Sequence, residues 1–95
     1  MCRVDHISID LNQVRSSEHL HQMLMEQLDF PSWYGRNWDA FWDAITGLVD
    51  MPETLEFVGW SNFQVRFPRD AHLLKTCFDR MAQQYKTLAP DVKYR

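Results

Sequence analysis

The 95-residue sequence lacks the features that define several protein classes. Its two cysteines, Cys2 and Cys77, have no CxxC partners, which excludes a disulfide scaffold and a cysteine-rich zinc site. No apolar run approaches the roughly 20 residues that span a bilayer, and the N-terminal residues lack the apolar segment of a secretory signal. Only three glycines occur, and they form no phosphate-binding loop. We therefore expect a cytoplasmic protein without membrane contact, with two free thiols and with Cys77 buried.

Lysine and arginine are absent from residues 37–56, although ten of them occur elsewhere. This stretch has a net charge of −5, the rest of the chain has a net charge of +2, and the whole has −3. Such a stretch repels a phosphate backbone, so direct nucleic-acid binding is not expected. A basic protein is its electrostatic complement. The acids in question are Asp39, Asp43, Asp50, Glu53 and Glu56.

The chain does contain enough apolar and aromatic side chains for a compact core. Hydrophobic residues make up 45% of it and aromatic residues 14%, with four tryptophans. No internal repeat, low-complexity tract or linker divides it, so we expect one domain over residues 1–95. The order of the predicted elements is strand, helices, strand, helix, strand. This order favours an α/β fold with a three-stranded, mostly parallel sheet packed against about three to four helices.

The individual elements follow from periodicity and capping residues. Strands are predicted at 4–11, 54–60 and 92–94. Helices are predicted from the N-cap Ser16 to near Asp29, from the N-cap Asn37 to just before Gly47, and from Pro68 onward. Residues 61–68 alternate apolar and polar side chains, which allows an edge strand or an apolar loop over the core.

The helix that follows Asn37 has one charged edge. With about 100° per residue, Asp39, Asp43 and Thr46 fall on the same side, beside an apolar stripe that includes Trp42. The helix dipole alone can account for Asp39 in the first turn. Asp43 lies in mid-helix, where Asp is a poor helix former and repels Asp39 at i, i+4. This local cost suggests an external partner, although a solvated helix face is the alternative.

Paired carboxylates could also serve an enzyme, by acid–base chemistry or by binding Mg²⁺ or Ca²⁺. The residues that would complete such a site are missing from the sequence near them: there is no adjacent His, Ser or Cys and no further ligand spacing. His19 and His21 project about 200° apart on a helix and cannot share a metal. We therefore expect no catalytic residue, metal or cofactor, and keep a carboxylate- or metal-dependent enzyme as the alternative.

Two aromatic residues, Trp33 and Tyr34, stand on a predicted loop next to Gly35. A loop buries two large rings only at a cost, and aromatic side chains beside a charged patch are typical of interface hot spots. The loop and the acidic helix edge together indicate a binding surface for a basic protein.

The segment WYGRNWDAFWDAITGLV, residues 33–49, resembles the barstar family, the intracellular inhibitors of the secreted ribonuclease barnase. The likeness begins at Leu20-His21-Gln22, includes Pro31, and continues through Pro52 and Leu55-Glu56. It implies a small α/β fold with a parallel three-stranded sheet. It also implies an immunity protein that blocks the active site of a basic ribonuclease toxin, as a monomer in a 1:1 complex. An inhibitor of a toxin with another activity is the related alternative.

Carried over by the motif, Asp43 is the deepest anion of the inhibitory surface and Asp39 is its neighbour. The resemblance implies that the residues framing them are Trp33, Tyr34, Gly35, Asn37, Trp42, Thr46 and Gly47. The sequence departs from the family pattern at three surrounding positions. Arg36 and Arg80 stand where the pattern has acids, and Leu48 stands where it has tryptophan.

Overall fold

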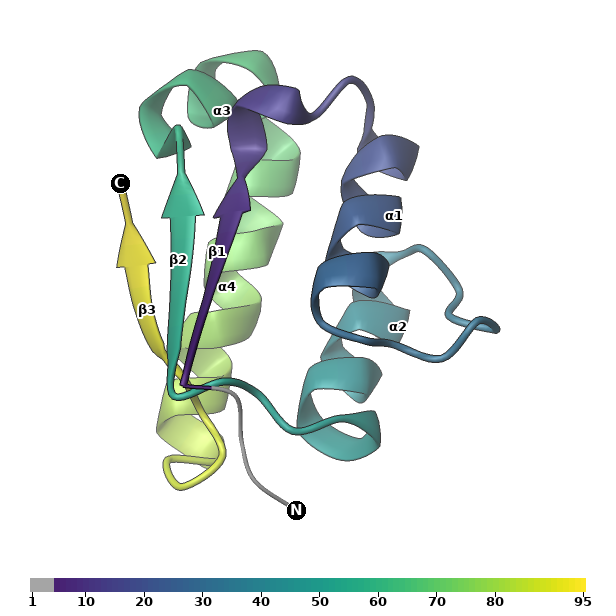
Figure 1. Cartoon of the computed structure of the whole chain (residues 1–95), viewed down its shortest axis with the longest axis vertical. Coiled ribbons are helices and arrows are strands. Elements are labelled where there is room, and N and C mark those ends of the chain that lie inside the picture. Colours follow the sequence, from purple (N-terminus) through teal and green to yellow (C-terminus); the bar gives the residue numbers. More distant parts are fainter. Residues whose placement is uncertain (1–4) are drawn as a thin grey trace.

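The computed structural model describes residues 5–95 and contains a three-stranded parallel sheet with helices against one face (Figure 1). The strands, in spatial order, are β1 (His6–Asp10), β2 (Thr54–Val58) and β3 (Asp91–Tyr94). The helices are α1 (Ser17–Gln27), α2 (Trp38–Asp43), α3 (Trp60–Arg66) and α4 (Pro68–Gln84). A 3₁₀ turn (Leu11–Gln13) follows β1, and a π-helical turn (Ala44–Leu48) extends α2. The predicted fold class is confirmed.

Helices make both connections between neighbouring parallel strands. Helices α1 and α2 lie between β1 and β2 in the chain, and α3 and α4 lie between β2 and β3. Helix α4 runs behind the sheet, and α1 and α2 lie beside it (Figure 1). The strand residues that alternate toward the helices are apolar: Ile7, Ile9, Leu55, Phe57, Val92 and Tyr94. The row Ser8, Glu56 and Lys93 is in register on the opposite, polar face.

Aromatic rings join the layers of the core. Phe78 of α4 lies 5.7 Å from Phe41 of α2 and 5.9 Å from Phe57 of β2, between ring centroids. All three rings are at least 97% buried. Burying each such side chain is worth about 1.5–3 kcal/mol, so these contacts fix α2 firmly against α4 and the sheet. The acidic edge of α2 therefore projects from a rigid base.

The structure corrects the prediction for residues 61–68, which form neither an edge strand nor a loop. Helix α3 covers most of this segment; its Trp60 and Phe63 are buried in the core, and Phe67, directly after the helix, packs against the core. Val65, which completed the apparent alternation, is 82% exposed. Gly59 precedes the helix with φ of +78°, a left-handed conformation that suits glycine. The buried residues of this segment therefore follow helical spacing, although its apolar residues also alternate as in a strand.

Two further expectations change at element ends. Gly47 lies inside the π-helical turn rather than beyond the helix, because the helical segment continues to Leu48. Strand β1 ends at Asp10, and Leu11 opens the 3₁₀ turn. Cys77 is buried as expected, and it is a free thiol. Cys2 and the first residue of the predicted strand, Val4, lie outside the described residues.

Candidate functional site

Asn37 sets the start of α2 and thereby the direction of its acidic edge. Its Oδ1 accepts the backbone N–H of Ala40 at 2.7 Å, and its Nδ2 donates to the carbonyl of Gly35 at 3.2 Å. The first bond satisfies one of the unpaired amides of the first helical turn. The second ties the helix to the preceding loop. Asn37 is the predicted N-cap, and this prediction is confirmed.

Asp39 and Asp43 are exposed on α2, one helical turn apart. Asp39 is in the first turn, where the helix dipole favours a negative charge. Within residues 5–95, none of the ion pairs involves either carboxylate. The predicted pair is therefore open to solvent and to a partner. Their mutual repulsion is not offset by an internal cation bonded to them.

Trp42 lies beside this pair and carries a cation on its ring. The guanidinium carbon of Arg80, on α4, is 4.2 Å from the ring centroid of Trp42, and the centroid of the Tyr85 ring is 6.2 Å from that of Trp42. Such a cation–π contact at an exposed site is worth about 0.5–1 kcal/mol. The position of Arg80 is thus fixed near the acidic edge. The sequence marked Arg80 as a departure from the family pattern but gave no sign of this contact.

The predicted aromatic loop divides between surface and core. Trp33 is 70% exposed, whereas Tyr34 is 94% buried. The hydroxyl of Tyr34 lies 2.7 Å from Nδ1 of His21 on α1, and its ring packs 4.9 Å from Phe30. Burial raises the pKa of Tyr34, so its hydroxyl stays protonated. Tyr34 therefore supports the loop from beneath, and Trp33 is the ring that a partner can reach.

A polar network beneath α2 was not predicted. Asp70, in the first turn of α4, accepts the indole N–H of Trp38 at 3.1 Å and the hydroxyl of Ser17. The His21 ring packs edge-on against Trp38 at 4.6 Å. Burial is the larger influence on His21 and lowers its pKa, while the charge of Asp70 raises it. The helical spacing of His21 with Leu24 was the available signal that this histidine faces the core.

Thr46, Gly47 and Leu48 continue the surface beyond Asp43. The Thr46 hydroxyl donates to the carbonyl of Trp42 at 2.7 Å, and Leu48 is 45% exposed. A Cβ placed on Gly47 would meet no atom within 4 Å. By contrast, a Cβ on Gly35 would lie 3.2 Å from Nδ2 of Asn37. Packing within the protein therefore restricts position 35 and leaves position 47 open toward solvent.

Most of the predicted site residues lie together at α2. The structure brings Asp39, Asp43, Trp42, Thr46 and Gly47 together on α2 and the turn after it, with Asn37 at its start. Arg36, between Gly35 and Asn37, has φ of +53° and donates to Oε1 of Gln22 at 2.6 Å, so it reaches toward α1. The buried Tyr34 belongs to the support of this surface.

The buried thiol of Cys77, on α4, is influenced by the charges of both Arg80 and Asp39. Burial raises the pKa of its thiol to about 11, the positive charge of Arg80 lowers it, and the negative charge of Asp39 raises it again. Both charges therefore act on one buried atom. At neutral pH this thiol is protonated and unreactive.

Within residues 5–95, no group of three or more His, Cys, Asp and Glu side chains is placed to share a metal ion. In the same residues, every helix is too short or too polar to cross a bilayer.

Comparisons with known proteins identify the family. The family model described as Barstar (barnase inhibitor) matches residues 4–94. The protein named "Putative ribonuclease inhibitor YrdF" of Bacillus subtilis (strain 168) is 53% identical over 49 residues, which are 52% of this chain and 54% of that protein. The match thus spans about half the length of this relative. Since the family model covers nearly the whole sequence, the chain belongs to the barstar family of barnase inhibitors.

Proposed function

We propose that this protein is an immunity protein that inhibits a basic ribonuclease toxin by occluding its active site. The observation that carries the proposal is the exposed pair Asp39 and Asp43, which has no internal ion-pair partner among the described residues. A ribonuclease cleft must be cationic to bind RNA phosphate. A rigid pair of carboxylates can take the place of two phosphates in such a cleft.

The residues around Asp39 and Asp43 suit a surface that binds a partner better than a catalytic site. Trp33 offers an exposed ring, Trp42 a partly buried one, and Gly47 a position where another backbone can approach closely. Asn37, Gly35 and Tyr34 hold the loop and helix in place. Rigid presentation lowers the entropy lost on binding. The proposal therefore assigns no chemistry to the chain itself and no cofactor.

The proposal also covers the oligomeric state and the cellular compartment of the protein. A 1:1 complex with a monomer follows if one acidic edge fills one cleft. A cytoplasmic location would keep the free thiol of Cys77 reduced and place the inhibitor where a producing cell needs protection. A toxin of another activity remains the second candidate, because Arg36 and Arg80 change the charge around the acidic pair.

The proposal is tested by titrating RNA cleavage by barnase and by a panel of related ribonucleases with the purified protein. We expect stoichiometric inhibition of at least one enzyme. Asp43→Ala should weaken that inhibition at least tenfold, because the partner's cation is left buried and unpaired. Asp91→Ala, which removes an exposed carboxylate on β3, is the matched control and should inhibit like the wild type.

Equal inhibition by Asp43→Ala and the wild type would refute the role of the acidic pair. Tight binding of Mg²⁺, Ca²⁺ or Zn²⁺ in calorimetry, or turnover by the protein alone, would favour the enzyme alternative instead.

A further inference from the structure

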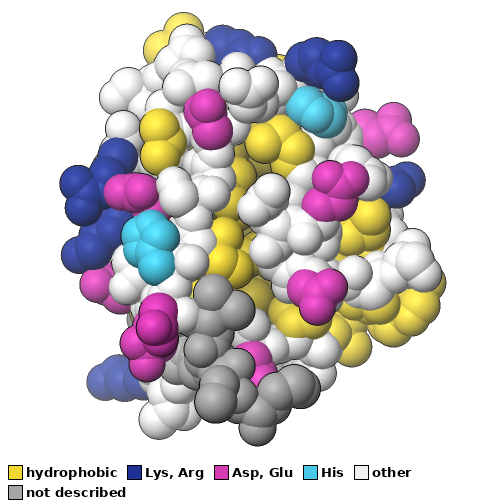
Figure 2. Space-filling model, viewed as in Figure 1, with side chains coloured by type: hydrophobic (Ala, Val, Ile, Leu, Met, Phe, Trp, Pro, Cys, Tyr) yellow, Lys and Arg dark blue, Asp and Glu magenta, His cyan; other side chains and the backbone are white. Residues whose placement is uncertain are grey.

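Asp70, in the first turn of α4, is the only buried acid among residues 5–95. On the face drawn in Figure 2, by contrast, the visible Asp and Glu side chains stand at the surface. The carboxylate of Asp70 takes part in none of the ion pairs of the described residues. Removing a carboxylate from water is costly, and apolar side chains in the place of a buried charge are often equally or more stabilising. A role other than stability is therefore expected for Asp70.

The hydrogen bonds of Asp70 join three helices at one point. Its Oδ2 accepts the hydroxyl of Ser17 at the start of α1, and its Oδ1 accepts the indole N–H of Trp38, at the start of α2, at 3.1 Å. The Trp38 ring packs edge-on against His21 of α1, with 4.6 Å between centroids. Nδ1 of His21 lies 2.7 Å from the hydroxyl of Tyr34. One carboxylate on α4 thus connects α1, α2 and the loop before α2.

The starts of these helices are not tightly packed against one another. A pocket of about 580 Å³ opens between them, and Ser17, Trp38 and Asp70 are among its lining residues. The ring contact of α2 with α4 lies farther along, where Phe41 is 5.7 Å from Phe78. Apolar contacts are not directional, whereas a hydrogen bond restricts both distance and angle. The bonds of Asp70 are therefore suited to set the rotation of α2 about its own axis.

The rotation of α2 decides where its acidic edge points. Asp39 follows Trp38 directly in the chain, and Asp43 lies one turn farther on. Because side chains reach about 5–6 Å from the helix axis, a rotation of about 20° moves a carboxylate by about 2 Å. Such a displacement is enough to break a hydrogen bond to a partner.

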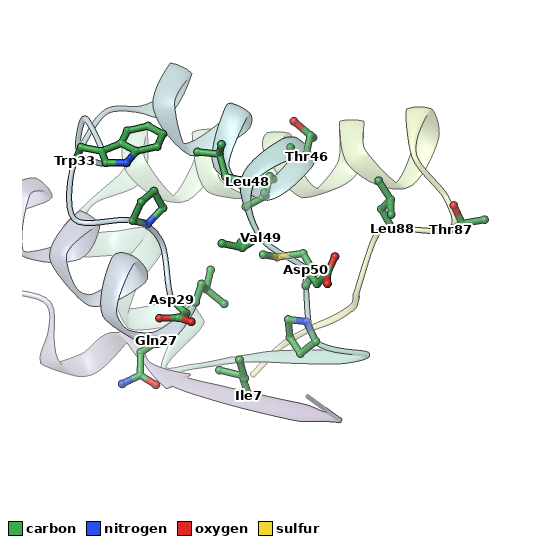
Figure 3. A pocket seen from close by; sticks show the side chains of 16 residues that line it. Ile7, Gln27, Asp29, Trp33, Thr46, Leu48, Val49, Asp50, Thr87 and Leu88 are labelled. Carbon is green, nitrogen blue, oxygen red and sulfur yellow. The ribbon is translucent and has the colours of Figure 1, made fainter. Parts of the chain in front are cut away.

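The same rotation moves the turn after α2 relative to the loop before it. Figure 3 shows Trp33 of the loop and Leu48 of the π-helical turn, which line one open pocket. A partner that contacts both side chains meets them in the right places only if α2 keeps its orientation. The connection from Asp70 through Trp38 and His21 to Tyr34 holds the helix and the loop together.

We infer that Asp70 is a positioning residue for the inhibitory surface, that is, for Asp39, Asp43 and the residues around them. It fixes the orientation of α2 relative to α1 and α4 and adds nothing to stability. The inference rests on the proposed function for the identity of the partner. The orientation of α2 can be measured without any partner.

The test compares two replacements of Asp70. Asp70→Asn keeps an oxygen for the indole of Trp38, and its amide group can donate to the hydroxyl oxygen of Ser17, so both bonds persist without the charge. The double variant Ser17→Ala/Asp70→Leu removes the acceptor and one of its donors. Asp79→Leu, at an exposed carboxylate of the same helix, is the matched control.

The first readout needs no partner. Residual dipolar couplings are recorded for the backbone amides of the full chain, labelled with ¹⁵N. The couplings of α2 should fit the wild-type orientation relative to α4 in Asp70→Asn and Asp79→Leu. In the double variant they should depart from it, while those of α4 still agree with one another. The urea midpoint of the double variant should equal or exceed that of the wild type, because a buried charge has been replaced by apolar groups.

The second readout is inhibition of a ribonuclease that the wild type blocks. The double variant should inhibit at least tenfold more weakly, although it is as stable as the wild type. Asp70→Asn and Asp79→Leu should inhibit within twofold of the wild type. Recovery by the conservative replacement shows that the hydrogen bonds, rather than the charge, position α2.

Three results would overturn the inference. The couplings of α2 in the double variant could keep the wild-type orientation, or Asp70→Asn could lose as much inhibition as the double variant. The urea midpoint and the inhibition could also fall together, which would give Asp70 a purely structural role. If the wild type inhibits no ribonuclease, the proposed function fails, and the couplings and the midpoint alone decide the role of Asp70.

Discussion

At the scale of single residues, a buried histidine links the binding loop to the rest of the protein. His21 is 97% buried and contacts both Tyr34 and Trp38, which flank the loop that leads into α2. Its lowered pKa means that the folded state holds it neutral, while the unfolded chain binds a proton near pH 6.5. Protonation therefore favours unfolding.

The free energy of unfolding should fall as the pH drops below about 6.5, by up to about 1.4 kcal/mol per pH unit for this one group. Above pH 6.5 the contribution of His21 is fully present and constant. Urea unfolding between pH 5 and 8 measures this profile. His21→Gln should flatten it, and His72→Gln, at an exposed histidine, should not. An unchanged profile in His21→Gln would show that other groups cause the loss.

Arg80 is the residue at which the charge of the inhibitory surface is most easily retuned. Its guanidinium is held on the ring of Trp42, the chain neighbour of Asp43, and its positive charge opposes the acidic field of α2. Arg80→Glu should raise the association rate with a basic ribonuclease severalfold at 50 mM NaCl, and much less at 500 mM, because salt screens the field. Stopped-flow fluorescence measures both rates.

The matched control is Lys93→Glu, which makes the same charge change on the polar outer face of the sheet. It should alter the association rate far less than Arg80→Glu does. Equal acceleration in both variants would mean that net charge alone matters. No acceleration in either would place Arg80 in contact with an anion of the partner.

At the scale of elements, the short helix α2 depends on its cap. It has six residues before the π-helical turn, so its own hydrogen bonds contribute little stability and packing supplies most of it. Asn37→Ala removes the cap to Ala40 and the bond to Gly35. We expect a loss of about 1 kcal/mol in the free energy of unfolding, measured by urea denaturation.

Replacement by another good cap separates capping from side-chain volume. Asn37→Ser keeps an oxygen for the Ala40 amide and should recover most of the lost stability. If Asn37→Ala proved as stable as the wild type, packing alone would fix the start of α2, and the role assigned to Asn37 would be wrong.

The elements also show where sequence patterns succeed and where they fail. Long or well-capped elements such as α1 and α4 are predictable, because many apolar positions repeat and the caps agree with them. Helix α3 was missed because seven residues contain too few periods to distinguish Phe63, which is buried, from Val65, which is exposed. The left-handed conformation of Gly59 and the packing of this segment against α4 favour a helix here. Neither can be read from the spacing of apolar residues.

At the scale of the whole molecule, the fold converts a local charge pattern into a shaped surface. The acidic edge of α2 could be derived from spacing, because helix geometry alone sets which side chains share a face. Its support could not, because Asp70 is 32 residues from Trp38 and 53 from Ser17 in the chain. The same holds for the contact of Arg80 with Trp42, which joins α4 to α2.

The central claim, that the acidic pair holds a ribonuclease, is tested most directly by capture from secreted and lysate fractions of the source organism. Wild-type protein and the double variant Asp39→Ala/Asp43→Ala are immobilised side by side, and released proteins are assayed for RNA cleavage. The account predicts a basic protein that is retained by the wild type alone and cleaves RNA once released. Equal retention on both surfaces, or a retained partner without ribonuclease activity, would contradict it.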